Sequence, residues 1–162
     1  MDKSEFRYVA FRAEGDKIIG TVVKYGDEAQ FGEWTETFEA GSLRFSDVIV
    51  NLQHDRGRPV VRSGAGLELR DSSDALVAEI HLPNTTYARE ARELVDAGIL
   101  RGLSMEFRAK RDSWNGKRRT VNEAELFGIG IVDRPAYSDS TIAERFGRSF
   151  VPVPKVPRKV FV

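Results

Sequence analysis

The sequence contains no cysteine, and three of its six prolines lie within residues 148–162. The absence of cysteine excludes disulfides, thiolate catalysis and cysteine zinc sites, and it suits a reducing compartment. No stretch approaches the apolar length needed to span a bilayer, and the first residues lack the apolar core of a signal peptide. We therefore expect a soluble, intracellular protein with no membrane partner.

An excess of charge of either sign is also missing. Lys plus Arg and Asp plus Glu are both 25, so the formal net charge is zero. Phosphate binding usually needs a basic surface, so this balance argues against nucleic acid as a partner. The basic residues at 110–111 and 117–119 flank Asn115-Gly116, and we interpret them as a charged hairpin tip rather than a nucleic-acid patch.

The 162 residues suffice for one domain, which we place at residues 1–147. The remaining residues, 148–162, are rich in proline and valine. Proline blocks both helix and central strand, so an extended tail is expected, and its apolar residues favour a docking arm.

Strand-like patterns dominate the domain. Alternating or buried apolar runs separated by turn residues predict strands at 6–12, 18–25, 48–54, 60–61, 67–69, 76–82, 103–108 and 120–132. Asn115-Gly116 predicts a hairpin joining the last two. The fold class predicted is α+β, mainly β, as an antiparallel β-barrel or meander flanked by a few helices.

One helix is signalled clearly, over residues 87–97, because Tyr87, Ala91, Leu94 and Val95 fall on one face. Thr85 or Thr86 can cap its start, and Gly98 follows its last turn. Two further short helices are expected at 42–45, with Ser42 as the cap, and at 140–146. Either 87–97 or 140–146 could serve a homodimer, although packing of a helix on its own domain explains the same pattern.

Ser104 follows a glycine-punctuated segment, Gly98 to Gly102, and an isolated histidine, His54, follows a mostly apolar run. A serine hydroxyl is a weak nucleophile that needs a base within hydrogen-bond reach, and histidine titrates in the useful range. The two together suggest a serine hydrolase. Taken singly, Ser104 also fits a turn residue and His54 a histidine at a strand end. The second histidine, His81, is interpreted as structural.

No cofactor and no metal site are expected. The two histidines do not have the His-x-x-x-His spacing of a helical zinc motif, and cysteine ligands are absent.

The chain resembles the prohead (capsid maturation) serine proteases of HK97-type tailed phages, a resemblance spanning roughly residues 20 to 140. It rests on the order and spacing of five segments: Gly20-Thr-Val-Val-Lys-Tyr25, Trp34-Thr-Glu-Thr-Phe-Glu-Ala-Gly-Ser-Leu43, Leu52-Gln-His-Asp55, Gly98-Ile-Leu-Arg-Gly-Leu-Ser-Met-Glu-Phe107 and Val132-Asp-Arg-Pro-Ala-Tyr137.

The resemblance implies a fold similar to the herpesvirus assemblins, with a β-barrel flanked by helices. It implies a serine endopeptidase that cleaves scaffold or capsid-protein segments, and possibly its own tail, inside an assembling procapsid in the host cytoplasm. It also implies a possible homodimer. In this scheme Ser104 matches the nucleophile and His54 matches the base.

The third catalytic member is where the sequence departs from the family. The family pattern carries an acidic residue at the position of Gly128, and glycine cannot orient an imidazole. We place Glu125 first as the replacement, although its odd offset puts it on the other strand face unless a bulge intervenes. The candidates left open are Glu106, Glu123, Glu79 and Asp55, together with His81, since the herpesvirus enzymes use a second histidine. A catalytic dyad of Ser104 and His54 without a third member also stays open.

Three functions are compatible with these patterns. The first is an active capsid maturation protease. The second, motivated by Gly128 and the tail, is a catalytically weak or inactive protease-like protein that supports capsid assembly. The third is a ligand-binding β-barrel without chemistry.

Overall fold

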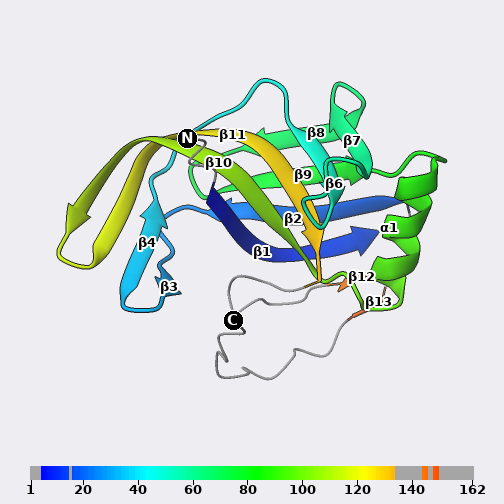
Figure 1. The fold of residues 1–162 in the computed structure, drawn as a ribbon, viewed down its shortest axis with the longest axis horizontal. Helices are drawn as coiled ribbons and strands as arrows, with labels where there is room; N and C mark the ends of the chain where they lie inside the picture. Colours follow the sequence, from blue (N-terminus) through cyan, green and yellow to red (C-terminus); the bar gives the residue numbers. More distant parts are fainter. Residues whose placement is uncertain (1–4, 15, 134–143, 146–147, 150–162) are drawn as a thin grey trace.

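A computed structural model describes residues 5–14, 16–133, 144–145 and 148–149 (Figure 1). The described chain is mainly β, with eleven strands in one sheet, a separate two-stranded sheet and one helix. Hydrogen-bonded neighbours follow the order β10-β1-β2-β9-β8-β7-β6-β11-β4-β3; β5 pairs with β11, and β10 also pairs with β11. The strands are β1 (Glu5–Glu14), β2 (Lys17–Lys24), β3 (Ala29–Phe31), β4 (Trp34–Phe38), β5 (Leu43–Arg44), β6 (Ile49–Leu52), β7 (Pro59–Ser63), β8 (Gly66–Asp71), β9 (Ala75–His81), β10 (Gly102–Asn115), β11 (Arg118–Val132), β12 (Glu144–Arg145) and β13 (Arg148–Ser149).

The core lies on one face of this sheet. In β9, Leu76, Ala78 and Ile80 are fully buried and alternate with partly buried or exposed residues. The same period of two runs through most of β2, whereas the first six residues of β10 are all buried. Apolar residues from most of the strands and from the helix meet in a single buried cluster.

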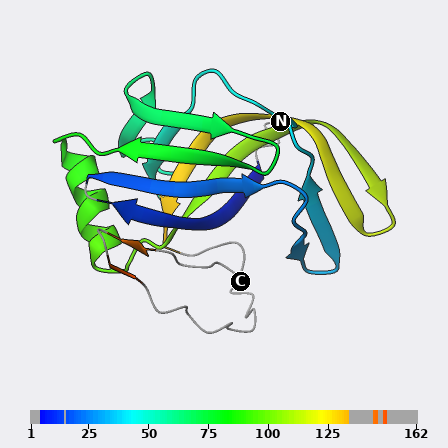
Figure 2. The same ribbon diagram turned by 180° about the vertical axis from the view of Figure 1, so that it is seen from behind.

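The longest two strands form a hairpin that reaches beyond the rest of the sheet. β10 and β11 are joined at Asn115-Gly116, where Gly116 has a φ of +61°, so the predicted turn is confirmed. The outer part of this hairpin, together with β3 and β4, forms an arm at one end of the molecule (Figures 1 and 2). Inside the hairpin, the register shifts between Glu106 and Phe107 because Phe127 is an extra residue on β11.

The predicted main helix is confirmed as α1 (Thr86–Asp96), which lies at the end opposite the arm (Figure 1). Thr85 occupies the N-cap position without a side-chain capping hydrogen bond, and Gly98, at φ +76°, ends the helix. Ala88, Ala91 and Val95 face the core.

The two short helices expected elsewhere are not found where the structure describes the chain. Residues 42–45 contain β5, whose Leu43 pairs with Ala124 of β11, so the predicted helix there is wrong. In the segment 140–146, Glu144–Arg145 is the strand β12 and the other residues lie outside the described part. Pairing with a neighbouring strand therefore overrides the local capping signal at Ser42.

The mainly β class is confirmed, whereas a closed barrel stays a prediction. The expectation of a purely antiparallel arrangement is wrong, because β4, β5 and β6 pair in parallel with β11, and β7 pairs in parallel with β8. β10 pairs with both β1 and β11, but the sheet continues past β11 into β4 and the edge strand β3, so it is not closed as a whole. Of the predicted tail, 148–162, only β13 is described. Within the described ranges, no helix is both long and apolar enough to cross a membrane.

Candidate active site

The site begins with the outward face of β10. Leu103, Met105 and Phe107 point into the core and are at most 1% exposed. Ser104 and Glu106 alternate with them and therefore share the opposite face. Both are nevertheless buried, at 5% and 6% exposure, so other parts of the chain cover this face of the strand.

Two glycines of β11 lie directly across from these two side chains. Gly130 pairs with Ser104, and Gly128 pairs with Glu106. On the other side of β11, Gly130 pairs with Asn51 of the parallel strand β6. Residues opposite each other in a sheet project to the same face, so the two glycines leave a trough between β6 and β10.

His54 enters this trough from the end of β6. The strand ends at Leu52, and the next two residues, Gln53 and His54, have φ values of +54° and +56°. Each left-handed non-glycine residue costs about 1–2 kcal/mol, so the surrounding contacts must hold this turn in place. The turn reverses the chain and directs the imidazole back over the sheet.

Asp55 shapes the loop that follows. Its backbone N–H donates to the Leu52 carbonyl at 2.8 Å, and its carboxylate accepts the Gly57 N–H at 2.9 Å. The Arg58 N–H donates to the Asp55 carbonyl at 3.0 Å. Asp55, one of the acids that the sequence left open, therefore stabilises the turn through its carboxylate.

The imidazole of His54 lies against Gly130. A Cβ atom added to that glycine would be 2.7 Å from His54 Cε1 and 2.8 Å from Nδ1, which is closer than real Cβ contacts allow. Ser104 is the neighbour of Gly130 on β10, and opposed Cβ positions in an antiparallel pair are about 4.5–5.5 Å apart. The imidazole therefore lies over the strand position directly opposite Ser104.

The other side of the imidazole meets a carboxylate. His54 Nδ1 lies 2.9 Å from Glu106 Oε1, and the two side chains are 19% and 8% exposed. In the tautomer whose proton is on Nδ1, the imidazole donates that proton to the carboxylate. This tautomer leaves Nε2 of the neutral ring as the basic atom.

Two opposing influences act on the pKa of His54. Burial is the larger and lowers the pKa below its usual 6.5, because a buried imidazolium loses hydration. The charge of Glu106 and its hydrogen bond act in the opposite direction. The net pKa is lowered, so the imidazole is neutral at neutral pH, which is the form that accepts a proton.

Gly128 supplies space for Glu106. A Cβ atom at Gly128 would lie 3.1 Å from Glu106 Cδ and 3.3 Å from Oε2. Gly128 allows a close approach of Glu106 and does not serve a special backbone conformation, since it is not among the positive-φ glycines. The carboxylate found beside His54 therefore stands on β10, across from the β11 position where the resemblance led us to expect an acid.

Glu125 is placed differently. The bulge at Phe127 does bring it to the face of Ser104 and Glu106, opposite Arg108. Its side chain is 47% exposed, and its carboxylate lies 3.6 Å from Lys110 Nζ. Glu123, another open candidate, pairs with Arg111 further along the arm. Of these acids, the structure brings Glu106 to His54.

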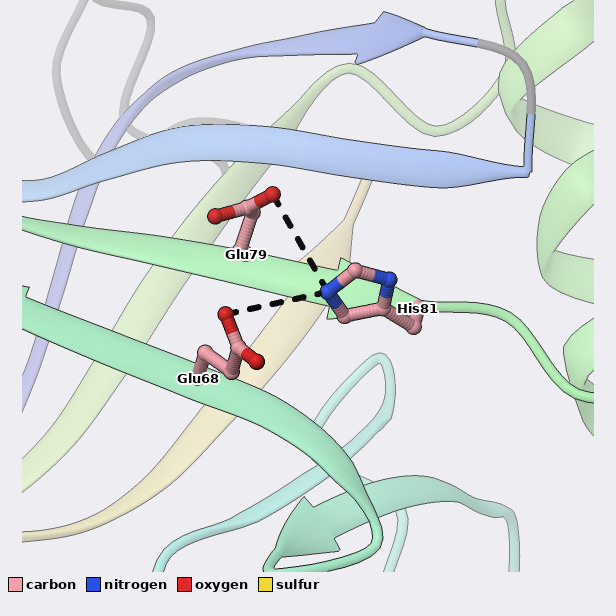
Figure 3. Close-up of side chains that lie close together, drawn as sticks. All are labelled: Glu68, Glu79 and His81. Atoms are coloured by element: carbon pink, nitrogen blue, oxygen red, sulfur yellow. Dashed lines mark ion pairs between the residues drawn. The ribbon is translucent and has the colours of Figure 1, made fainter.

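The second histidine belongs to a different cluster. His81 Nε2 lies 3.9 Å from Glu79 Oε1 and 3.9 Å from Glu68 Oε2, on the outer face of β8 and β9 (Figure 3). These three side chains could in geometry surround a metal ion. However, Lys17 and Arg70 approach the two Glu79 oxygens at 3.0 and 2.9 Å. The hydrogen bond from Lys17, chiefly, lowers the pKa of Glu79. The cluster is therefore an ion-pair network whose cations already neutralise its carboxylates.

The basic residues of the hairpin tip also have acidic partners. Lys117 pairs with Glu33 at 3.2 Å, and Arg118 pairs with Glu28. Arg119, which is buried, contacts Glu36 at 3.0 Å and Asp112 at 2.8 Å. These pairs agree with the interpretation of this region as a charged hairpin tip.

Sequence reasoning underestimated two features of this site. It left Glu106 among several open acids, although its spacing of two from Ser104 was a valid signal for a shared face. It also did not assign a role to Gly130. The repeat Gly128-Ile129-Gly130 within a strand was the available signal, since glycine inside a strand often marks a close approach.

Comparison with known proteins gives a family. A model of the caudovirus prohead serine proteases matches residues 5–152. Searches of curated proteins and of solved structures gave no match. The matched region covers nearly the whole chain and contains Ser104, His54 and Glu106. The chain belongs to the caudovirus prohead serine protease family.

Proposed function

We propose that this protein is a serine endopeptidase of prohead maturation, with Ser104 as nucleophile, His54 as base and Glu106 as orienting acid. The observation that carries the proposal is the 2.9 Å contact between His54 Nδ1 and Glu106 Oε1, on the face that bears Ser104. Nucleophile, base and orienting acid on one face are the arrangement that acyl transfer requires.

The reaction would proceed by acyl transfer. Ser104 Oγ attacks the peptide carbonyl carbon while its proton passes to His54 Nε2. The C–N bond then breaks, and His54 returns that proton to the departing amine. Water attacks the acyl-enzyme with His54 again taking a proton, which is finally given to Ser104 Oγ as the acid fragment leaves. Backbone N–H groups would stabilise the oxyanion in both halves.

Glu106 would hold the imidazole in place and stabilise its protonated form. In a triad, the acid keeps the proton on Nδ1 so that Nε2 faces the nucleophile. Glu106 is better supported in this role than Glu125, because Glu125 lies beside Lys110 and is half exposed. Gly128 thus ceases to be a reason to expect an inactive enzyme.

Family membership supports capsid or scaffold protein as the substrate and the assembling procapsid in the host cytoplasm as the place of action. We also propose that the strands from β1 to β11 act as the barrel of an assemblin-like fold, since β10 pairs with both β1 and β11. A homodimer is part of the same proposal, as are the absence of nucleic-acid and membrane partners and of a cofactor.

The test is co-expression with the cognate capsid and scaffold proteins, with cleavage products identified by mass spectrometry. The wild-type chain should produce defined fragments and Ser104→Ala should produce none. Identical fragment patterns from both would reject the proposal. If shells assemble equally well with either chain and no cleavage occurs, the protease-like assembly protein becomes the better account.

A further inference from the structure

The turn that carries His54 continues a β-ladder in an unusual way. β6 runs parallel to β11, and the last paired residues are Leu52 and Ile131. The next residue, Gln53, still donates its backbone N–H to the Ile131 carbonyl at 3.0 Å. Of the two backbone hydrogen bonds that a residue makes to its neighbour in a parallel ladder, Gln53 therefore keeps the donated one, although β6 has already ended.

The other of these two hydrogen bonds comes from a side chain. In a parallel ladder, a residue that donates to one carbonyl uses its own carbonyl to accept the N–H two residues further along the partner strand. That N–H belongs to Asp133. Gln53 is left-handed, at φ +54°, so its main chain leaves the sheet, and Gln53 Oε1 accepts the Asp133 N–H at 2.9 Å.

We propose that Gln53 is a positioning residue of the active site, whose side-chain oxygen replaces its own carbonyl in the β6–β11 ladder. Because the side chain accepts this hydrogen bond, the main chain can turn back at residue 53 while the Ile131 carbonyl and the Asp133 N–H both keep a hydrogen-bond partner. The inference rests on the proposed function, because it assigns a role in placing the catalytic base.

The hydrogen bonds of Gln53 can affect the position of the His54 ring because the two residues are adjacent in the chain. One peptide bond separates it from His54, whose ring must fit between Gly130 and Glu106 with little spare room. Both Gln53 hydrogen bonds go to the end of β11, the strand that also carries Gly130. These two hydrogen bonds therefore fix the turn that carries His54 relative to β11, the strand against which the imidazole ring packs.

A displacement of about 1 Å at a catalytic group can reduce turnover about 100-fold. Gln53→Met keeps the length of the side chain and removes the accepting oxygen. We expect it to lower kcat by about 10- to 100-fold with KM nearly unchanged. Gln53→Glu keeps an oxygen at the same distance and should restore most of the lost turnover.

Two controls separate positioning from general loss of structure. Thermal melting reports whether Gln53→Met is folded. Gln53→Gly removes the left-handed strain as well as the oxygen, so it should stay folded and still lose turnover. Turnover equal to wild type in folded Gln53→Met or Gln53→Gly would overturn the inference.

A second readout does not depend on proteolysis. The His54 Nδ1 proton, held by Glu106, should give a low-field NMR signal in the wild-type chain and in Gln53→Glu. That signal should broaden or disappear in Gln53→Met. If the wild type cleaves nothing, the proposed function fails, and the NMR comparison still decides the inference. An unchanged signal in Gln53→Met would contradict it.

Discussion

The protein has two histidines, each beside glutamate, and their surroundings differ in almost every respect. His54 contacts Glu106 at 2.9 Å, and both side chains are largely buried. His81 lies 3.9 Å from Glu68 and Glu79, and its side chain is 45% exposed. From residue types alone, the two histidine–glutamate contacts could not be told apart as candidate catalytic pairs.

The difference lies in what else each carboxylate contacts. Two cations, Lys17 and Arg70, compete with His81 for Glu79. At the other pair, the Glu106 carboxylate contacts His54 Nδ1 at 2.9 Å, over the space left by Gly128. A carboxylate orients an imidazole only where other cations do not neutralise it and water does not screen it. Ser104 lies on the same face of β10 as Glu106, beside the first pair.

Replacing each histidine by alanine should give the largest difference in activity between the two sites. His54→Ala is expected to lower kcat/KM by about 10⁶-fold, as when the base of a serine triad is lost. His81→Ala removes only an exposed group, and its turnover should match wild type. Cleavage of a capsid-derived peptide by the purified variants measures both. Comparable losses in the two variants would contradict the assignment of the base.

Replacing the glutamates separates an orienting acid from a surface ion pair. Glu106→Gln should lower kcat by about 10⁴-fold, because an amide does not enforce the required imidazole tautomer. Glu79→Gln and Glu125→Gln should retain wild-type turnover. Single-turnover kinetics with all three variants provides the measurement. If Glu125→Gln showed the large loss, the acid would be Glu125, as first predicted from the sequence.

Adding one methyl group tests the close packing at His54. Gly130→Ala places a Cβ within 2.9 Å of three imidazole ring atoms, so the ring must move. We expect turnover to fall about 100-fold. Gly128→Ala, where the nearest contact is 3.1 Å, should cause a smaller loss. Melting temperatures of the two variants serve as the folding control, and wild-type activity in folded Gly130→Ala would be inconsistent with the site.

The smallest expected effect is a shift in the pH profile. Burial lowers the pKa of His54, so the acid limb of kcat/KM should have its midpoint below 6.5. Glu106 acts to raise this pKa, so Glu106→Gln should move the midpoint to still lower pH. His81→Gln should leave it unchanged. A wild-type midpoint above 6.5 would show that the charge of Glu106 outweighs burial.

The sequence predicts much of the fold because its signals are local. Alternating apolar residues locate β9, and the Asn115-Gly116 turn locates the β10–β11 hairpin. The short helix expected at 42–45 failed because its Leu43 joins a distant strand through Ala124. Long-range pairing of that kind leaves no mark within a few residues.

In the candidate site, too, local motifs could be predicted from the sequence and long-range pairing could not. Ser104 and His54 could be named from motifs, whereas choosing among the acids required the register of β10 against β11. The bulge at Phe127 decides which β11 residues face the site, and a one-residue shift exchanges the faces. The left-handed turn at Gln53 and His54 could not be predicted, because neither position is a glycine or an asparagine, the residues that usually indicate such a backbone conformation.

The pairing of Glu106 with Gly128 has a consequence for reading related sequences. The positions of Glu106 and Gly128 lie opposite each other on adjacent strands, and a Cβ at Gly128 would already be 3.1 Å from Glu106 Cδ. Relatives with an acid at the position of Gly128 are therefore expected to carry a small residue at the position of Glu106, and the reverse. Alignment columns compared singly would score each such relative as lacking its acid, although we expect its carboxylate to lie beside the same imidazole.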